Sequence, residues 1–459
     1  MAESRKTLRL AVPIIIGNVG QTLITLTDNI MVGRLGADAL GAAGFTGGLF
    51  FVFSIFGIGI LAPTAALFAQ SHSRNENDEG GEWLRHSVFT AVAISVVMMT
   101  ALWLMKPLMA QMGQPAEVVR LSDGFANYLI LSIFPSLIYQ AYKQFTDGIG
   151  KTTVGMYVMI SCVLLNILGN YVFINGHFGF PALGLNGSGL ATLICRSLMA
   201  MMMVYYTHRH PEFKKYFTLR WRSRLQNGRL KELFRLGIPN GLTYIFEVGA
   251  FTLSSVMMGW LGAAPLAAHQ ISLNLASISF LVTVGIGAAG TIRVGFENGI
   301  RKFHEARYAG RVALVLGATY MLVSAVFVYF TRARLATIYT NDAEVVSYAV
   351  GFLAIAAAFQ FFDGIQAVAV GILRGLQDTK WPSILAFIAY WVIGLPIGYY
   401  LAFAKGLQGE GIWWGLFIGL VFTAIFLTLR FERLAGKRRA SAIRAERISR
   451  RFSQRSGIA

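Results

Sequence analysis

Charged side chains are scarce in this sequence. Asp, Glu, Lys and Arg make up 14% of the 459 residues, whereas hydrophobic residues make up 55%. A chain with so few charges cannot cover the surface of a soluble globule. The composition therefore excludes an ordinary soluble domain and predicts a polytopic membrane protein.

Cysteine and catalytic motifs are also nearly absent. Only Cys162 and Cys195 occur, both inside apolar runs, so we expect two small core residues and neither a disulfide framework nor a cysteine metal site. No P-loop, HExxH or nucleophile elbow is present. The sequence thus gives no support for ATP hydrolysis or a membrane-embedded hydrolase, and we expect no enzyme and no organic cofactor.

Acidic residues are fewer than basic ones, 22 against 40, which gives a net charge of +18. A nucleic-acid partner is not favoured, because the basic residues lie between apolar runs. They gather at the N-terminus, in the segments 207–235 and 293–311, and after residue 429. The positive-inside rule then predicts an inner-membrane protein with both termini in the cytoplasm. The first apolar run lacks a small-residue cleavage site, so we do not expect a signal peptide.

Apolar runs of spanning length occur twelve times. They are expected at 10–33, 41–69, 84–106, 121–146, 152–175, 183–206, 233–260, 266–292, 308–330, 345–374, 381–404 and 409–431.

The sequence repeats internally with an offset of 226 or 227 residues. LAVPIIIG around Pro13 recurs as LGIPNGLT around Pro239, and GRLGADALGAAG recurs as GWLGAAPLAAHQ. We therefore predict an all-α membrane protein with two pseudo-symmetric six-helix bundles. Its expected parts are an N-terminal lobe, a basic cytoplasmic linker, a C-terminal lobe and a basic tail, which is a helix on the inner leaflet or a solvated extension. Their limits are 1–207, 208–232, 233–431 and 432–459.

Two acids lie at similar depth in the second copy. Glu247 is 12 residues from Arg235, and Asp363 is 11 from Arg374, so both lie about 16–18 Å from the same surface. A carboxylate at such depth is costly unless it is neutralised or faces a polar cavity. The pair predicts a site for a proton or Na⁺. The alternative is a carboxyl kept permanently neutral in the core.

A second polar set is expected in the first copy. Asp28 is 19 residues from Arg9, and Asn170 is 19 from Lys151, so both lie about 28 Å from the basic surface. Asn166 is one turn from Asn170, and Thr192 lies at comparable height. These oxygen-bearing side chains suit Na⁺ or a proton relay. As isolated residues, such side chains more often join helices by hydrogen bonds.

Other polar and aromatic residues in the runs are weaker candidates for a substrate cavity, because each alone is more often a packing residue. They are Gln21, Phe246, Phe251, Gln270, Asn274, Phe359, Gln360 and Gln366. Arg196 is expected to snorkel or to counter an acid. His269 is expected to be a hydrogen-bonded histidine at the membrane interface.

Several motifs together resemble one family. They are the start LxLxxPxxxxN with Pro13 and Asp28, the segment IPxxLxxxFE that ends in Glu247, and FFDGIQxVxxGxLRGLQDTK around Asp363. The duplication and these motifs, over residues 8–431, are similar to the multidrug and toxic compound extrusion (MATE) family, with its MATE/MOP-type fold, and to its NorM-like bacterial branch.

The resemblance implies an antiporter that exports organic cations and amphipathic drugs in exchange for Na⁺ or H⁺ by rocker-type alternating access. It also implies a cation site at Glu247 and Asp363, a second site at Asp28, Asn166, Asn170 and Thr192, and bending near Pro13. No metal beyond Na⁺ and no partner chain is expected, and the chain is expected to work as a monomer. A lipid-linked precursor flippase of the related superfamily is the alternative; a membrane-embedded transferase is not favoured.

Overall fold

The computed structural model describes residues 2–109, 111–217 and 225–455, with side chains up to residue 441. Within these ranges the chain is helical and contains no strand, and twelve helices are long and apolar enough to cross a membrane. The predicted all-α membrane fold is confirmed. Most helices extend beyond the predicted apolar runs, because their terminal turns carry charged residues that the hydropathy pattern leaves out.

The first half of the chain forms the helices α1 to α8. Their bounds are α1 (Ala2–Gly33), α2 (Ala37–Leu61), α3 (Thr64–Ser73), α4 (Asn77–Met109), α5 (Ala116–Gly148), α6 (Thr152–Asn175), α7 (Leu185–Arg209) and α8 (Pro211–Lys214). The predicted second run is interrupted between α2 and α3 at Pro63, whose ring cannot supply a backbone donor.

The second half contains four long helices, one irregular helix and a long final helix. Their bounds are α9 (Asn227–Leu261), α10 (Ala263–Gly299), α11 (Phe303–Tyr339), α12 (Ala343–Gly375), α13 (Lys380–Phe387), the π-helix η2 (Ile388–Gly394), α14 (Leu395–Tyr399), the π-helix η3 (Tyr400–Ala404) and α15 (Gln408–Arg455). The span over residues 380–404 therefore alternates between α and π winding, whereas α6, its counterpart in the first copy, is regular.

Contacts group the residues into two units. The N-terminal unit is Pro13–Ile245, and the C-terminal unit is Met1–Val12 together with Phe246–Ala459. The division falls inside α1, after Val12, and inside α9, after Ile245. The part of each helix before the division therefore belongs to a different unit from the part after it. The internal repeat did not predict this exchange. The lobe limits given above remain a prediction about the two copies.

The repeat is visible in the backbone of both copies. Positive φ angles occur at matching turns: 115° at Gly36 and 126° at Gly262, and 58° at Asn75 and 59° at Arg301. The second pair follows α3 and α10, where a left-handed residue ends the helix. Arg301 adopts this conformation without the freedom of glycine, so the turn is imposed by the packing around it.

The repeat is equally visible in helix packing. A Cβ atom added at Gly148 on α5 would lie 2.7 Å from the carbonyl oxygen of Ala65 on α3. One added at Gly375 on α12 would lie 2.8 Å from the carbonyl oxygen of Thr291 on α10. Both pairs are related by the repeat offset. In each copy, therefore, an equivalent pair of helices packs closely at an equivalent glycine, which has no side chain to keep the helices apart.

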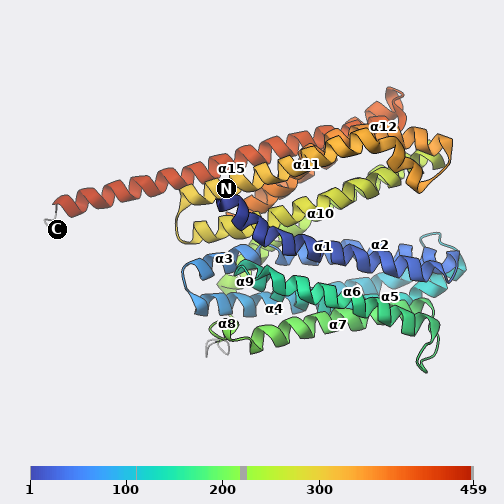
Figure 1. The fold of residues 1–459 in the computed structure, drawn as a ribbon, viewed down its shortest axis with the longest axis horizontal. Helices are drawn as coiled ribbons and strands as arrows, with labels where there is room; N and C mark the ends of the chain where they lie inside the picture. Colours follow the sequence, from blue (N-terminus) through green and yellow to red (C-terminus); the bar gives the residue numbers. More distant parts are fainter. Residues whose placement is uncertain (1, 110, 218–224, 456–459) are drawn as a thin grey trace. The chain divides into compact units, whose positions relative to one another are not determined.

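The basic tail continues the last span as one helix. α15 extends beyond the neighbouring helices of its unit (Figure 1). Glu432 pairs with Arg307 and Arg311 of α11, and Arg438 donates to the side chain of Asn298 at 2.7 Å. The tail is thus helical to residue 455, while its place on a leaflet remains a prediction. The side chains after residue 441 and the last four residues lie outside the described part.

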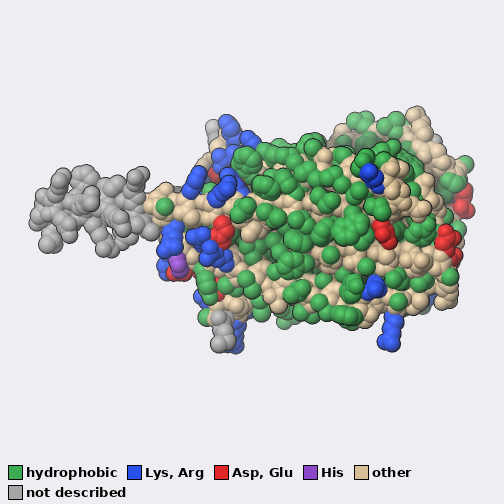
Figure 2. Space-filling model, turned by 90° about the horizontal axis from the view of Figure 1, so that it is seen from above, with side chains coloured by type: hydrophobic (Ala, Val, Ile, Leu, Met, Phe, Trp, Pro, Cys, Tyr) green, Lys and Arg blue, Asp and Glu red, His purple; other side chains and the backbone are tan. Residues whose placement is uncertain are grey.

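Apolar side chains cover the middle of the helices. Leu104 and Phe330 expose 74% and 79% of their surface, which would be unfavourable in water but suits a lipid environment. On the face drawn in Figure 2, apolar side chains cover the middle of the helices, and most Lys and Arg side chains lie toward the helix ends.

The two cysteines depart from the prediction. Cys162 on α6 and Cys195 on α7 form a disulfide, with their Cα atoms 5.9 Å apart. The expectation of two separate core residues was wrong. The two helices approach closely, because Gly169 of α6 packs against Ala191 of α7. The sequence places both cysteines in apolar runs but does not show that their helices are neighbours.

Candidate functional site

Two acids lie together in the interior of the C-terminal unit. Glu247 on α9 and Asp363 on α12 are 9% and 5% exposed, and they are close enough to interact electrostatically. Gln366, three residues after Asp363 on the same helix, is hydrogen-bonded to Glu247. In the described part of the chain, no Lys, Arg or His forms an ion pair with either acid. The pair therefore lacks the cation that normally compensates buried carboxylates.

An aromatic cluster lies in the core of the same unit, and its member Tyr390 lies close enough to both acids to interact with them electrostatically. The rings of Phe251 and Phe359 lie 6.1 Å apart, Phe359 lies 5.7 Å from Trp413, and Phe251 lies 6.1 Å from Tyr390. Phe359, Tyr390 and Trp413 are almost completely buried. Because the acids are buried in these surroundings, any charge placed on them must be balanced locally.

Several buried polar atoms around the acids have no protein partner. Among the described residues, the hydroxyl of Tyr390, Oε1 of Gln366 and Nε2 of Gln360 make no hydrogen bond. Ser324 donates to the other amide atom of Gln360, its Oε1, at 3.2 Å. A buried polar atom without a partner costs about 1–3 kcal/mol. Such atoms are typical of sites that receive water or an ion.

His269 does not behave as expected. Its ring is fully buried, and neither nitrogen has a hydrogen-bond partner among the described residues. It packs edge-on against Trp413 at 5.5 Å. The prediction of a hydrogen-bonded histidine was wrong, because α10 turns this position toward the aromatic core of its unit.

A second acid is held in the N-terminal unit by neutral groups. Asn170 on α6 donates to Oδ1 of Asp28 at 2.5 Å, and the Thr192 hydroxyl on α7 faces Oδ2 at 3.5 Å. Asn170 also donates to Oδ1 of Asn166 at 3.3 Å. Both asparagines are fully buried. The four side chains that were grouped by depth are therefore in contact.

A cavity lies beside this cluster. It has an empty volume of about 480 Å³, which includes the space at its open mouth, and its lining contains Asn166, Thr192, Gln21 and Arg196. Nη1 of Arg196 donates to the Ser132 hydroxyl at 2.9 Å. Arg196, which was expected to snorkel or to counter an acid, borders this cavity and lies close enough to Asp28 to interact with it electrostatically.

The other predicted cavity residues lie in different surroundings. Gln270 and Asn274 are exposed on α10, and Gln270 donates to the Ser255 hydroxyl at 3.4 Å. Phe246 packs on Phe387 at 5.1 Å. Their place in a substrate cavity stays a prediction.

A family model described as MatE matches residues 13–172 and 239–400. The chain belongs to the MatE family.

Relatives of this MatE chain match almost throughout. It is 36% identical over 437 residues to the probable multidrug resistance protein NorM of Pseudomonas aeruginosa, covering 94% of this chain and 90% of the relative. It is 37% identical over 446 residues to that of Rhizobium meliloti, covering 95% and 94%. A solved MATE structure in the bent conformation matches with a TM-score of 0.87 at 20% identity, covering 95% and 97%. The predicted family is confirmed.

A MatE chain of this type is a multidrug efflux transporter, a multi-pass membrane protein and not an enzyme. Its helix α1 passes through Pro13 without a break, and the division between the two units falls immediately before this residue. Bending at Pro13 remains a prediction.

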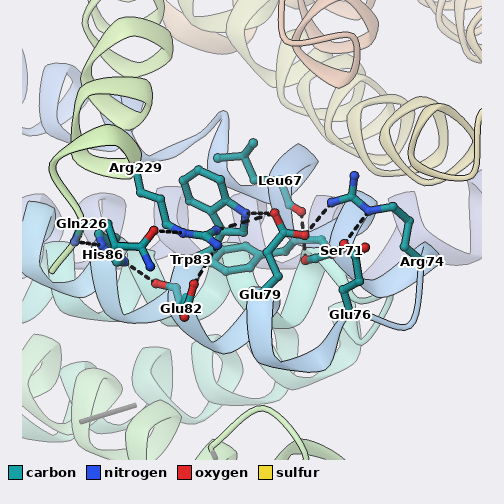
Figure 3. A network of polar contacts seen from close by, with 11 residues as sticks. Leu67, Ser71, Arg74, Glu76, Glu79, Glu82, Trp83, His86, Gln226 and Arg229 are labelled. Carbon is teal, nitrogen blue, oxygen red and sulfur yellow. Dashed lines mark hydrogen bonds and ion pairs between the residues drawn. The ribbon is translucent and has the colours of Figure 1, made fainter. Parts of the chain in front are cut away.

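The sequence did not reveal a polar network at the start of α4 (Figure 3). Arg229 on α9 pairs with Glu82 at 2.7 Å and lies over the ring of Trp83 at 4.8 Å. His86 accepts from the backbone nitrogen of Gln226 at 2.9 Å. These groups are about 140 residues apart in sequence, so no local spacing could have indicated the contact.

The linker is attached to the same helices at its beginning. The hydroxyl of Tyr216 lies 2.7 Å from Nδ1 of His72, and burial raises the pKa of Tyr216 to about 12. Gly81 on α4 allows the approach, because an added Cβ would lie 1.9 Å from the carbonyl oxygen of Tyr216. Both ends of the linker described in the structure are therefore anchored on the N-terminal unit.

Proposed function

We propose that this transporter exports organic cations and related amphipathic compounds in exchange for Na⁺ or H⁺ by rocker-type alternating access, with Glu247 and Asp363 as the ion site. The observation that carries the proposal is the buried acid pair without a basic partner among the described residues. The oxygen atoms of Tyr390 and Gln366 that lack partners add neutral ligands of the kind that Na⁺ and protons use.

The coupling follows from the difference between loaded and empty acids. When neither acid carries a proton or Na⁺, two negative charges repel one another in a dry interior. Loading a cation removes this repulsion, so the ion favours whichever conformation buries the pair most completely. A ligand shifts a conformational equilibrium only by its differential affinity. Substrate that favours the opposite conformation is then expelled as the ion enters.

The lipid-linked precursor flippase receives less support. Recognition of a pyrophosphate group would require several basic side chains in one cavity. The lining of the cavity in the N-terminal unit contains Arg196 as its single basic residue.

We further propose that the protein lies in the inner membrane as a monomer with both termini in the cytoplasm. Glu3 pairs with Arg293, and Arg438 contacts Asn298, so the N-terminus and α15 lie at the same end of α10. A fluorescent-protein fusion after Ala459 should then be bright and a phosphatase fusion inactive. The reverse pattern would reject this orientation.

The function is tested in proteoliposomes with imposed gradients. A fluorescent cation such as ethidium should accumulate in the lumen against its own gradient when Na⁺ or H⁺ is higher in the lumen than outside, because the ion leaves as the dye enters. Dissipation of that ion gradient with a specific ionophore should stop the accumulation. Transport that is unchanged after both gradients are removed would reject ion-coupled exchange.

A further inference from the structure

His269 on α10 is a buried polar residue that the ion site does not use. Its ring is fully buried, and neither Nδ1 nor Nε2 has a hydrogen-bond partner among the described residues. No charged side chain in the part of the chain that the structure describes, Glu410 of α15 and the acid pair included, acts on it electrostatically. A neutral imidazole carries one donor and one acceptor, so a purely structural role would be served better by an apolar ring.

The position of His269 along its helix places it toward one side of the membrane. α10 begins at Ala263, so His269 lies about 9 Å from that end. Arg293 lies near the other end of α10, where it pairs with Glu3. With the N-terminus in the cytoplasm, as proposed above, the Ala263 end of α10 faces the outside. His269 therefore lies near the outer end of its span.

Two aromatic rings connect His269 with the acid pair. The ring of His269 lies 5.5 Å from that of Trp413, and Trp413 lies 5.7 Å from Phe359. Asp363 is one helical turn from Phe359 on α12. His269 is thus close to the acids but does not contact them, so a proton can pass between them only through intervening water.

The same core contains polar atoms that water can bridge. Nε1 of Trp413 and the hydroxyl of Tyr390 make no hydrogen bond among the described residues, although both side chains are completely buried. Tyr390 lies close enough to both acids to interact with them electrostatically. Buried polar atoms in folded proteins almost always bond to protein or to ordered water. Water that bonds to these atoms would join the imidazole to the carboxyl groups.

We propose that His269 relays protons between the outer side of the membrane and the acid pair, and that the proton is therefore the coupling ion of this chain. The inference rests on the proposed function and selects H⁺ over Na⁺. One ring nitrogen takes a proton from outer water, and the other gives its proton to the water chain. A carboxylate of the pair accepts a proton from that chain, and the imidazole becomes neutral again.

The chemistry of the side chain favours a proton over a metal ion. Imidazole exchanges protons near neutral pH and has two separate nitrogens, one to receive and one to release a proton. Hard cations such as Na⁺ take oxygen ligands instead. An imidazole on the route to the acids therefore serves proton transfer and contributes little to passage of Na⁺.

The test measures ethidium uptake into proteoliposomes that contain the full chain. A proton gradient at equal Na⁺ and a Na⁺ gradient at equal pH are imposed in separate experiments. We expect the proton gradient to drive uptake by the wild type. His269→Gln keeps a polar side chain of similar size but cannot exchange protons near neutral pH. Its maximal rate should fall at least about tenfold and depend less on pH, while the KM for ethidium stays nearly unchanged.

Two controls separate proton transfer from packing. His304→Gln removes an exposed histidine at the start of α11 and should keep the wild-type rate. His269→Ala leaves room for a small added ring, so imidazole in the buffer should restore part of the rate. Pyrazole has the same size but is not a base near neutral pH, and it should restore nothing. The same additions to the wild type report their effect on the gradient itself.

The outcomes distinguish this inference from the proposed function. Uptake driven by Na⁺ and indifferent to the proton gradient would overturn the inference and leave ion-coupled export intact, whereas uptake driven by neither ion would reject the function. An unchanged rate and pH profile in His269→Gln would also overturn the relay. Equal rescue by pyrazole and imidazole would assign His269 to packing. If His269→Gln does not fold, His269→Ala with the two added rings carries the test.

Discussion

The acids of the two units have opposite surroundings. Glu247 and Asp363 face one another among aromatic rings and lack an ion-pair partner in the described chain. Asp28 is a single acid, receives hydrogen bonds from an amide and a hydroxyl, and lies close enough to Arg196 to interact with it electrostatically. The two copies keep the same scaffold, so the difference lies in side chains. The two copies thus share a backbone arrangement but differ in the charged side chains that they place on it.

The repeat positions make this divergence explicit. At the offset of 226, Glu247 corresponds to Gln21 and Asp28 to Ser254, while at 227 Asp363 corresponds to Ser136. Each acid thus has a neutral polar counterpart. Removing the acids one by one therefore separates the role of each unit.

The largest effect is expected in the C-terminal unit. Glu247→Gln or Asp363→Asn removes the charge whose neutralisation drives the conformational change, so ion-dependent efflux should fall at least about tenfold. The measurement is efflux of a fluorescent cation driven by an imposed Na⁺ or H⁺ gradient. Asp38→Asn, which removes an exposed acid at the start of α2, is the control and should retain wild-type efflux. Full ion-dependent efflux by Glu247→Gln would contradict the assignment.

A smaller effect is expected from Asp28→Asn. The substituted amide keeps the size of the side chain and part of its hydrogen bonding, and the acid pair of the other unit remains intact. Efflux should fall severalfold while its dependence on the ion gradient persists. The same flux assay provides the measurement. Complete loss of ion dependence would show that coupling resides in the N-terminal unit and would reverse the comparison.

The shared scaffold should respond equally in both copies. Gly148→Ala and Gly375→Ala each place a Cβ atom within 2.8 Å of a backbone carbonyl. Each substitution should reduce the free energy of unfolding by about 1–3 kcal/mol through overpacking. Thermal unfolding in detergent measures this, and Gly48→Ala, where no atom lies within 4 Å of the added Cβ, is the matched control. A stability loss in only one copy would show that the equivalence of the two packing sites is superficial.

The smallest effect concerns the linker. The pKa of Tyr216 is raised to about 12, so the phenol stays protonated in the folded protein while it ionises in the unfolded chain above its ordinary value near 10. Unfolding is then favoured as pH rises from about 10 to about 12. Tyr216→Phe should show a slightly shallower loss of thermal stability between pH 9 and 11 than the wild type. If thermal stability falls equally steeply with pH in both proteins, Tyr216 does not contribute to the loss of stability at alkaline pH.

The depth of a residue in the membrane can be counted from the helical rise, and this explains how much of the site could be predicted. Glu247, Asp363, Asp28 and Asn170 lie in long apolar runs, where helical rise fixes height and where a charge is conspicuous. Residues at equal height in one bundle come into contact when their helices are neighbours. This holds for the helices of Glu247 and Asp363 and for those of Asp28 and Asn170. The twelve spans followed from the same strong hydropathy signal.

Lateral arrangement could not be predicted in the same way. Height does not tell which helix faces which, so the Cys162–Cys195 bond and the contacts of Arg229 were missed. The buried His269 was missed because rotation about the helix axis decides its surroundings. Each of these features depends on contacts between segments that are distant in sequence.

The π-helical turns of the span 380–404 have a mechanical consequence. A π turn holds more residues than an α turn, and each additional residue corresponds to about 100° of rotation about the axis. Tyr390 lies in the first of these segments and is completely buried. Rewinding that segment to α-helical pitch would rotate its phenol about the helix axis relative to the acids. The helix thus contains, within its own winding, a rotary degree of freedom beside the acids.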